Sequence, residues 1–153
     1  MLTAALLIAA AALPVQTLDG VLRAYPADAA APRSIFVVSY SKAGSKQASA
    51  WTKRLMDERA GIAASLFQVA VMDDVPKLFR SMAISGMSHD VPIAMHDHFW
   101  IVSTGGADWR ALAEPPSTKE ASVFVVEGRE KVVWKGHGEP SEAAVRELLG
   151  LFP

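Results

Sequence analysis

Short runs of apolar, β-branched and aromatic residues alternate with stretches of helical periodicity along most of this chain. The runs typical of buried strands are residues 34–40 (SIFVVSY), 66–72 (LFQVAVM), 99–102 (FWIV), 122–126 (SVFVV) and 131–134 (KVVW). Strands joined through helices pair in parallel and carry the helices on the faces of their sheet. The pattern therefore predicts an α/β fold with a central sheet of about five strands.

Helical spacing follows the first of these strands. Ala48, Trp51 and Leu55 recur at three- and four-residue intervals, so they share one face of a helix. Ser45 is a residue type that caps helices, and Gly61 is one that ends them. The sequence predicts that Ser45 is the cap of this helix.

A second helix is expected after the second strand, and a short one after the third. Pro76 suits a first helical position, and Leu78, Phe79 and Met82 share one face of the helix that follows it. Residues 108–113 form a shorter stretch of helical spacing. Together these segments continue the alternation of strand and helix.

The end of the chain is typical of a hairpin followed by a helix. Gly128 lies in the link between the last two strands, where a tight turn needs a positive φ. Pro140 is expected to start a final helix whose apolar stripe is Val145, Leu148 and Leu149. The expected order is β-α-β-α-β-α-β-β-α, a mixed sheet flanked by helices.

Composition excludes several classes of function. The 153 residues are 51% hydrophobic, carry a formal net charge of -1 and include no cysteine. A chain of this length forms one core. Without a thiolate it cannot support disulfide exchange, structural disulfides, iron–sulfur clusters or cysteine-bound zinc. Its basic residues are scattered among acidic ones, so we expect no nucleic-acid partner.

The amino-terminal part of the chain differs from the rest. Residues 1–14 are almost entirely apolar, which is typical of a secretory signal and shorter than the roughly 20 residues of a membrane span. A signal peptide or a short apolar anchor is expected here, and hence a protein that is exported to the periplasm or attached to the membrane. Residues 15–32 are predicted to be a linker, and residues 33–153 the folded domain.

The order of elements resembles the thioredoxin and peroxiredoxin superfamily. Residues 34–51 (SIFVVSYSKAGSKQASAW) resemble its first strand and active-site helix, and residues 123–138 (VFVVEGREKVVWKGHG) its terminal hairpin. The redox cysteines of that superfamily would fall near Gly44 and Gln47. The proline that its members place just before the hairpin strand would fall near Ala121. The resemblance therefore implies a thioredoxin-like fold whose redox site is vestigial.

Two segments resemble one family within that superfamily more closely. Residues 91–102 (VPIAMHDHFWIV) and 123–138 look like the mitochondrial ATPase-complex assembly factors, the "ATP ten" proteins. Members of that family also do without a working redox pair. The resemblance implies a non-enzymatic chaperone that binds protein and helps to build the membrane sector of ATP synthase.

The first candidate site is the turn from the first strand into the first helix. Lys42 and Ser45 lie where the positive end of the helix would face a bound anion. The alternative is that Ser45 only caps the helix and Lys42 is a solvated charge. We expect residues 42–47 and 87–98 to form the rim of the vestigial active-site face, because ligands of open α/β sheets bind where strands end.

The second candidate site is a cluster of metal-ligating residue types. Three histidines and two methionines fall within twelve residues: Met87, His89, Met95, His96 and His98. Imidazole with thioether suits Cu(I), and imidazole with carboxylate suits Zn. The alternative is that the methionines fill the core and the histidines pair with neighbouring aspartates. A copper- or zinc-binding periplasmic protein is therefore the second function hypothesis, and otherwise no cofactor is expected.

The tryptophans divide between core and surface. Trp51 and Trp100 are expected in the core, whereas Trp134 lies on the terminal hairpin, where it could contact a partner at a sheet edge. The leading hypothesis is a non-redox assembly factor or chaperone that binds protein. A cysteine-free enzyme of the peroxiredoxin type is the weakest hypothesis, because peroxide reduction would lack its thiolate.

Overall fold

The computed structural model describes residues 12–29, 32–128 and 131–153. The strands are β1 (Leu13–Thr17), β2 (Leu22–Tyr25), β3 (Arg33–Ser39), β4 (Leu66–Val71), β5 (Phe99–Val102), β6 (Ser122–Glu127) and β7 (Lys131–His137). The helices are α1 (Lys42–Glu58), α2 (Lys77–Asp90), α3 (Gly106–Ala113) and α4 (Glu142–Leu149), and two 3-10 helices are η1 (Ala60–Ser65) and η2 (Ile93–His98). No helix in the described ranges is long and apolar enough to cross a membrane.

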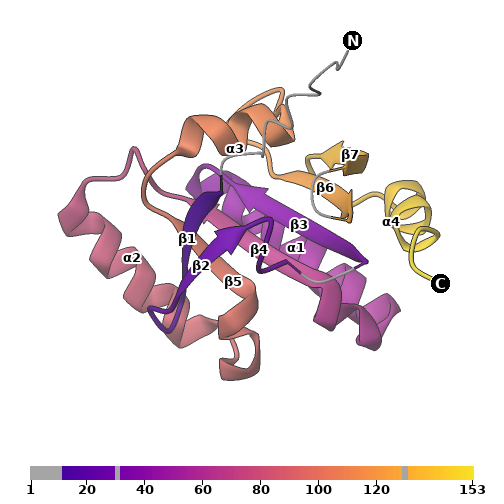
Figure 1. Ribbon diagram of the computed structural model, residues 1–153, viewed down its shortest axis with the longest axis horizontal. Coiled ribbons are helices and arrows are strands. Elements are labelled where there is room, and N and C mark those ends of the chain that lie inside the picture. The colour runs from indigo at the N-terminus through magenta and orange to yellow at the C-terminus, as the bar shows by residue number, and fades with distance from the viewer. Residues whose placement is uncertain (1–11, 30–31, 129–130) are drawn as a thin grey trace, which may run out of the picture.

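The strands form one mixed sheet in the order β2-β1-β5-β4-β3-β6-β7 (Figure 1). The three central strands β3, β4 and β5 run parallel, whereas β6 and β1 flank them in antiparallel register. This arrangement confirms the predicted mixed sheet with flanking helices. The described residues contribute seven strands to it, two more than the sequence predicts.

The two additional strands lie where a linker is expected. β1 and β2 pair with each other, and Gln16 and Thr17 of β1 pair with Ile101 and Trp100 of β5. The prediction of a linker over residues 15–32 is therefore wrong for the part that these strands occupy. The predicted signal or anchor, residues 1–14, lies outside the described residues except for its last three, and Leu13 and Pro14 begin β1.

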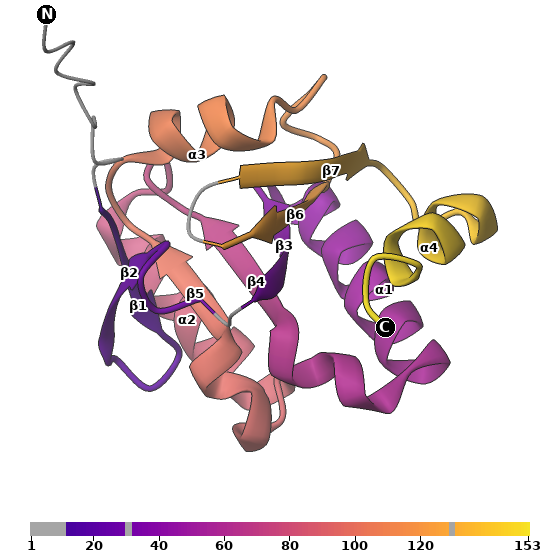
Figure 2. The same ribbon diagram turned by 45° about the vertical axis from the view of Figure 1, so that its right-hand side comes forward.

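The helices α1, α2 and α4 cover one face of the sheet, and α3 covers the other. On one face, α1 and α4 pack against β3 and β6, and α2 packs beside them against β4 and β5. On the other face lie α3 and Tyr25, around an aromatic cluster that includes Phe36, Trp100 and Trp109. Figure 2 shows α3 on the opposite side of β6 and β7 from α1 and α4. Trp51 and Trp100 are buried, as predicted.

Candidate functional site

The first candidate site lies where β3 ends and α1 begins, at the edge of the sheet formed by the carboxyl ends of its parallel strands. Ser41 caps α1, because its hydroxyl accepts a hydrogen bond from the Gly44 N–H at 3.1 Å. The prediction that Ser45 is the cap is wrong. Ser45 lies within the first turn, and its own N–H donates to the Ser41 carbonyl at 2.9 Å. Lys42 is exposed at the first position of the helix.

The residues at the predicted vestigial redox positions are brought together in space. The buried Ala121 N–H donates to the Gln47 side-chain oxygen at 2.8 Å. Gly44 is also buried, and a Cβ added there would lie 3.5 Å from the backbone of Glu120. The first two turns of α1 therefore contact the segment that leads into β6.

Polar side chains lie buried just beneath this contact. Burial raises the pKa of Tyr40 to about 12, and the nearby Ser122 hydroxyl and Arg110 guanidinium offset part of that rise. Arg110 lies 5.8 Å from the Tyr40 ring centroid and forms an ion pair with Asp73 at 3.2 Å. These groups tie α3 and β4 to the end of β3.

This edge carries no activated nucleophile among the residues that the structure describes. There is no cysteine in the chain. The Ser41 hydroxyl at this edge accepts from the Gly44 N–H and so serves as the cap of α1. Serine catalysis needs a positioned base, and no described histidine or carboxylate contacts the Ser41 hydroxyl.

The segment from Met87 to His98 lies at the opposite edge of the sheet. His98 Nδ1 is 2.9 Å from the carbonyl oxygen of Leu66, the first residue of β4, and Phe99 begins β5. Strands β3, β4 and β5 run parallel, so this is the edge where they begin. The prediction that residues 42–47 and 87–98 form one rim is therefore wrong, because α1 and α2 each run the length of the sheet between these edges.

The histidines of this segment have separate partners. His96 is buried, and its two ring nitrogens lie 2.9 Å from the Asp19 carboxylate and 2.8 Å from the Val91 carbonyl. These two hydrogen bonds, first the one to Asp19, raise the pKa of His96. His98 stacks on Phe67 with ring centroids 4.3 Å apart, and His89 is exposed.

The predicted metal cluster is not assembled in the part of the chain that is described. No three His, Cys, Asp or Glu side chains there gather so that they could hold a metal ion. Met87 packs against the core on α2, as the alternative interpretation expects, and Met95 is half-buried on η2. The 3-10 helix η2 separates His96 from His98, because two residues in a tight helix do not share a face.

Trp134 lies on the edge strand β7, as predicted, but its side chain packs within the protein. Its ring packs against Trp51 at a centroid distance of 6.2 Å, and its indole N–H donates to Glu147 of α4 at 3.0 Å. Its predicted contact with a partner remains a prediction.

The sequence analysis did not predict that one apolar face of α2 is exposed. Leu78, Phe79 and Met82 of α2 share one face, as predicted, but they are 74%, 60% and 68% exposed. The residues of α2 that pack on the sheet are Ala83, Ile84 and Met87. We call Leu78, Phe79 and Met82 the α2 patch. The signal was present in the sequence, because this helix has apolar residues on both faces.

Comparison with known proteins supports the fold and leaves the activity open. No protein-family model matches the chain, and no curated protein matches it. Solved structures do. An exposed lipoprotein thioredoxin from Streptococcus pneumoniae is 13% identical with a TM-score of 0.61, and the match covers 93% of this chain and all of that one (100%).

Two further structures belong to the same group of folds. StoA from Bacillus subtilis is 11% identical with a TM-score of 0.58, and the match covers 94% of this chain and 97% of that one. BsSco, a member of the Sco family of cytochrome c oxidase assembly proteins, is 9% identical with a TM-score of 0.59 and coverages of 91% and 90%. At these identities the likeness shows the fold, which is thioredoxin-like.

Proposed function

We propose that this protein is a thioredoxin-like binding protein without redox activity, which acts as an assembly factor or chaperone by holding an apolar segment of a partner protein. It is not an enzyme under this proposal. The positions that would carry the redox pair hold Gly44 and Gln47, and the chain has no cysteine to replace them. Without redox chemistry, the fold can still bind a partner through its surface.

The observation that carries the proposal is the α2 patch. Three large apolar side chains, each more than half exposed, stand together on one helix face. Isolated exposed apolar residues are ordinary, but contiguous ones on a soluble domain mark interaction sites. Figure 1 shows α2 at one side of the molecule, where a partner can approach it without displacing another element.

The nature of the partner is proposed from two resemblances. BsSco, which shares the fold, is described as a member of a family of cytochrome c oxidase assembly proteins. Residues 91–102 and 123–138 resemble the ATPase-complex assembly factors. Subunits of a membrane complex, with those of the membrane sector of ATP synthase first, are therefore the partners to test.

A location at the outer side of the membrane is part of the proposal. Residues 1–14 have the composition of a secretory signal or a short apolar anchor. The similar structure from Streptococcus pneumoniae is described as an exposed lipoprotein. A retained anchor would hold the folded domain at the membrane in which its partners reside, whereas cleavage would release it into the compartment beside that membrane.

Affinity capture with matched variants tests the proposal. The variant Leu78→Ser, Phe79→Ser, Met82→Ser removes the α2 patch, and the control variant Val21→Ser, Leu22→Ser removes exposed apolar residues at the start of β2. Both should fold normally, because exposed substitutions usually change stability by less than about 0.5 kcal/mol.

From gently solubilised membranes of the native host, the native chain and the control should recover the same partner. Recovery with the α2 variant should fall at least about tenfold, because truncated hot-spot residues cost about 2 kcal/mol or more each. Equal recovery by all three chains, or no stable partner for the native chain, would refute the proposal.

A further inference from the structure

A recess lies on the face of the sheet that α1 and α2 cover, away from the α2 patch. It opens between α1 and the end of α2, has a volume of about 340 Å³ and is floored by β4. Its apolar walls are Met56 of α1, Leu66, Met95 and Phe99, and its polar lining includes Thr52, Gln68 and His98. The volume and the mostly apolar lining with a few polar groups are those of small-ligand pockets.

Gln68 is the unusual residue of the floor. It lies in a central strand of the sheet, and it is the one position of β4 that is not fully buried. Its side-chain oxygen accepts a hydrogen bond from the Thr52 hydroxyl of α1 at 3.0 Å. The oxygen is therefore engaged, and the amide nitrogen has no partner among the described residues. Gln68 offers a hydrogen-bond donor to the recess.

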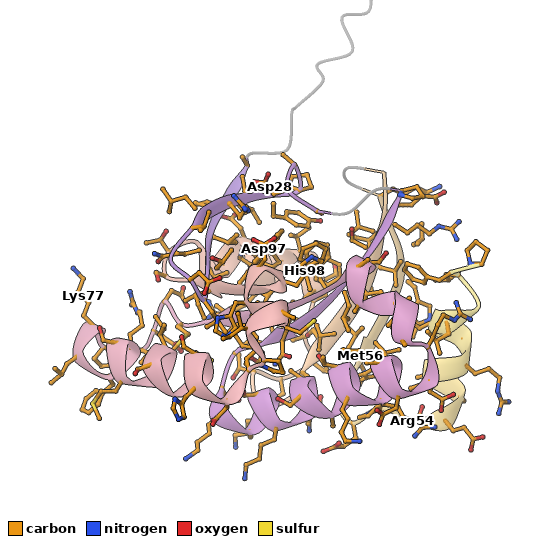
Figure 3. All side chains as sticks on the ribbon, turned by 90° about the horizontal axis from the view of Figure 1, so that it is seen from below. Asp28, Arg54, Met56, Lys77, Asp97 and His98 are labelled. Carbon is orange, nitrogen blue, oxygen red and sulfur yellow. The ribbon has the colours of Figure 1, made fainter. Side chains whose placement is uncertain are left out.

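His98 also lines the recess, next to the first residue of β5. Its Nδ1 lies 2.9 Å from the Leu66 carbonyl oxygen, so Nδ1 carries the proton and donates it. The ring is held flat against Phe67, with an angle of 4° between the ring planes. When the ring is neutral, Nε2 is an acceptor, and it has no hydrogen-bond partner within the described part of the chain. Figure 3 shows His98 and Met56 near the middle of the molecule, with Lys77 at the far end of α2.

The charges around the recess disfavour an anionic occupant. Lys53 and Asp57 both line it, but they form an ion pair with each other at 2.7 Å. Asp90 adds a negative charge at the end of α2. An anion would therefore find no free cation there and would face a carboxylate, which disfavours its binding.

We propose that this recess binds a neutral apolar group that carries an amide. The amide carbonyl accepts a hydrogen bond from the Gln68 nitrogen, the amide N–H donates to His98 Nε2, and the apolar part packs against Met56, Met95 and Phe99. A free small molecule and a residue within a peptide share this chemistry. The site uses none of the residues of the α2 patch, so it stands or falls independently of the proposed function.

Titration followed by NMR tests the site. The probes are N-acetyl-L-leucinamide, the capped tripeptide acetyl-Ala-Leu-Ala-amide and the anion N-acetyl-L-leucinate. The variant Gln68→Leu removes the donor and keeps a similar volume, and Met82→Ser, which lies outside the recess, is the matched control. A thermal unfolding curve for each variant shows that it is folded.

The amides should shift resonances of Thr52, Met56 and Met95, and Gln68→Leu should weaken their binding about five- to tenfold, as loss of one hydrogen bond does. Met82→Ser should bind like the native chain, and the anion should bind more weakly than either amide. Tighter binding of the tripeptide identifies a peptide as the natural source, and tighter binding of the single capped residue identifies a free small molecule. No binding of either amide, or equal affinity for native and Gln68→Leu chains, would overturn the proposal.

Discussion

The contact between Gln47 and Ala121 allows a quantitative test of the candidate site. Ala121 is fully buried, and its N–H has the Gln47 side-chain oxygen, 2.8 Å away, as its hydrogen-bond acceptor. In Gln47→Leu the side chain keeps its bulk and loses that acceptor, which leaves a buried donor without a partner. Such a group costs about 1–3 kcal/mol.

The expected loss of about 2 kcal/mol corresponds to a fall in Tm of about 4–8 °C for a domain of this size. Thermal and urea unfolding followed by tryptophan fluorescence measure it. Gln47→Glu is the matched control, because its carboxylate can still accept a hydrogen bond from the Ala121 N–H. This variant should keep most of the stability that Gln47→Leu loses. A Gln47→Leu chain as stable as the native one, or a Gln47→Glu chain destabilised equally, would refute the role given to this contact.

Two further predictions concern the two edges of the sheet. Because hydrogen bonds to Asp19 and Val91 raise the pKa of His96, folding favours its protonated form, so its contribution to stability is complete below the ordinary pKa of 6.5 and is lost as pH rises through the raised value. The free energy of unfolding should therefore fall more steeply with pH above 6.5 for the native chain than for His96→Gln, and parallel curves would contradict this. At the other edge, Gly44→Cys with Gln47→Cys should form an intramolecular disulfide, because a Cβ at Gly44 meets only ordinary contacts of 3.4–3.5 Å. Thiol titration should find no free thiol after oxidation and two after reduction, whereas two free thiols after oxidation would show that the positions do not face each other.

The central part of the fold could be predicted from the sequence because its signals are local. The run at residues 99–102 matches β5, and the run at residues 66–72 matches β4 to within one residue. In each case consecutive apolar residues lie between turn residues, which is the pattern of a strand buried on both faces. The helical stripe of Ala48, Trp51 and Leu55 is likewise buried as expected.

The amino-terminal strands could not be predicted in the same way. β1 contains Pro14 and Gln16, and its burial alternates along the strand, with Val15 and Thr17 buried. Its place in the sheet depends on pairing with β5, more than eighty residues later. Such long-range pairing is not encoded in any short window of sequence.

The candidate sites show the same division between local and distant information. The segment that leads into β6 lies against the beginning of α1, where Gln47 contacts Ala121, because the order of elements determines which loop faces this end of the helix. The predicted histidine cluster is not formed, because η2 directs His96 to Asp19 and His98 to Leu66. Residue spacing alone does not show these directions. The α2 patch was missed because a helix with apolar residues on two faces does not reveal which face packs.

The most direct measurement of the central claim is site-specific photocrosslinking in the native host. A photoreactive phenylalanine derivative in place of Met82, on the exposed face of α2, should join this chain to one defined membrane-complex subunit. The same group in place of Leu22, which is similarly exposed, should not. The absence of any adduct at position 82, or the same adducts from both positions, would contradict the account.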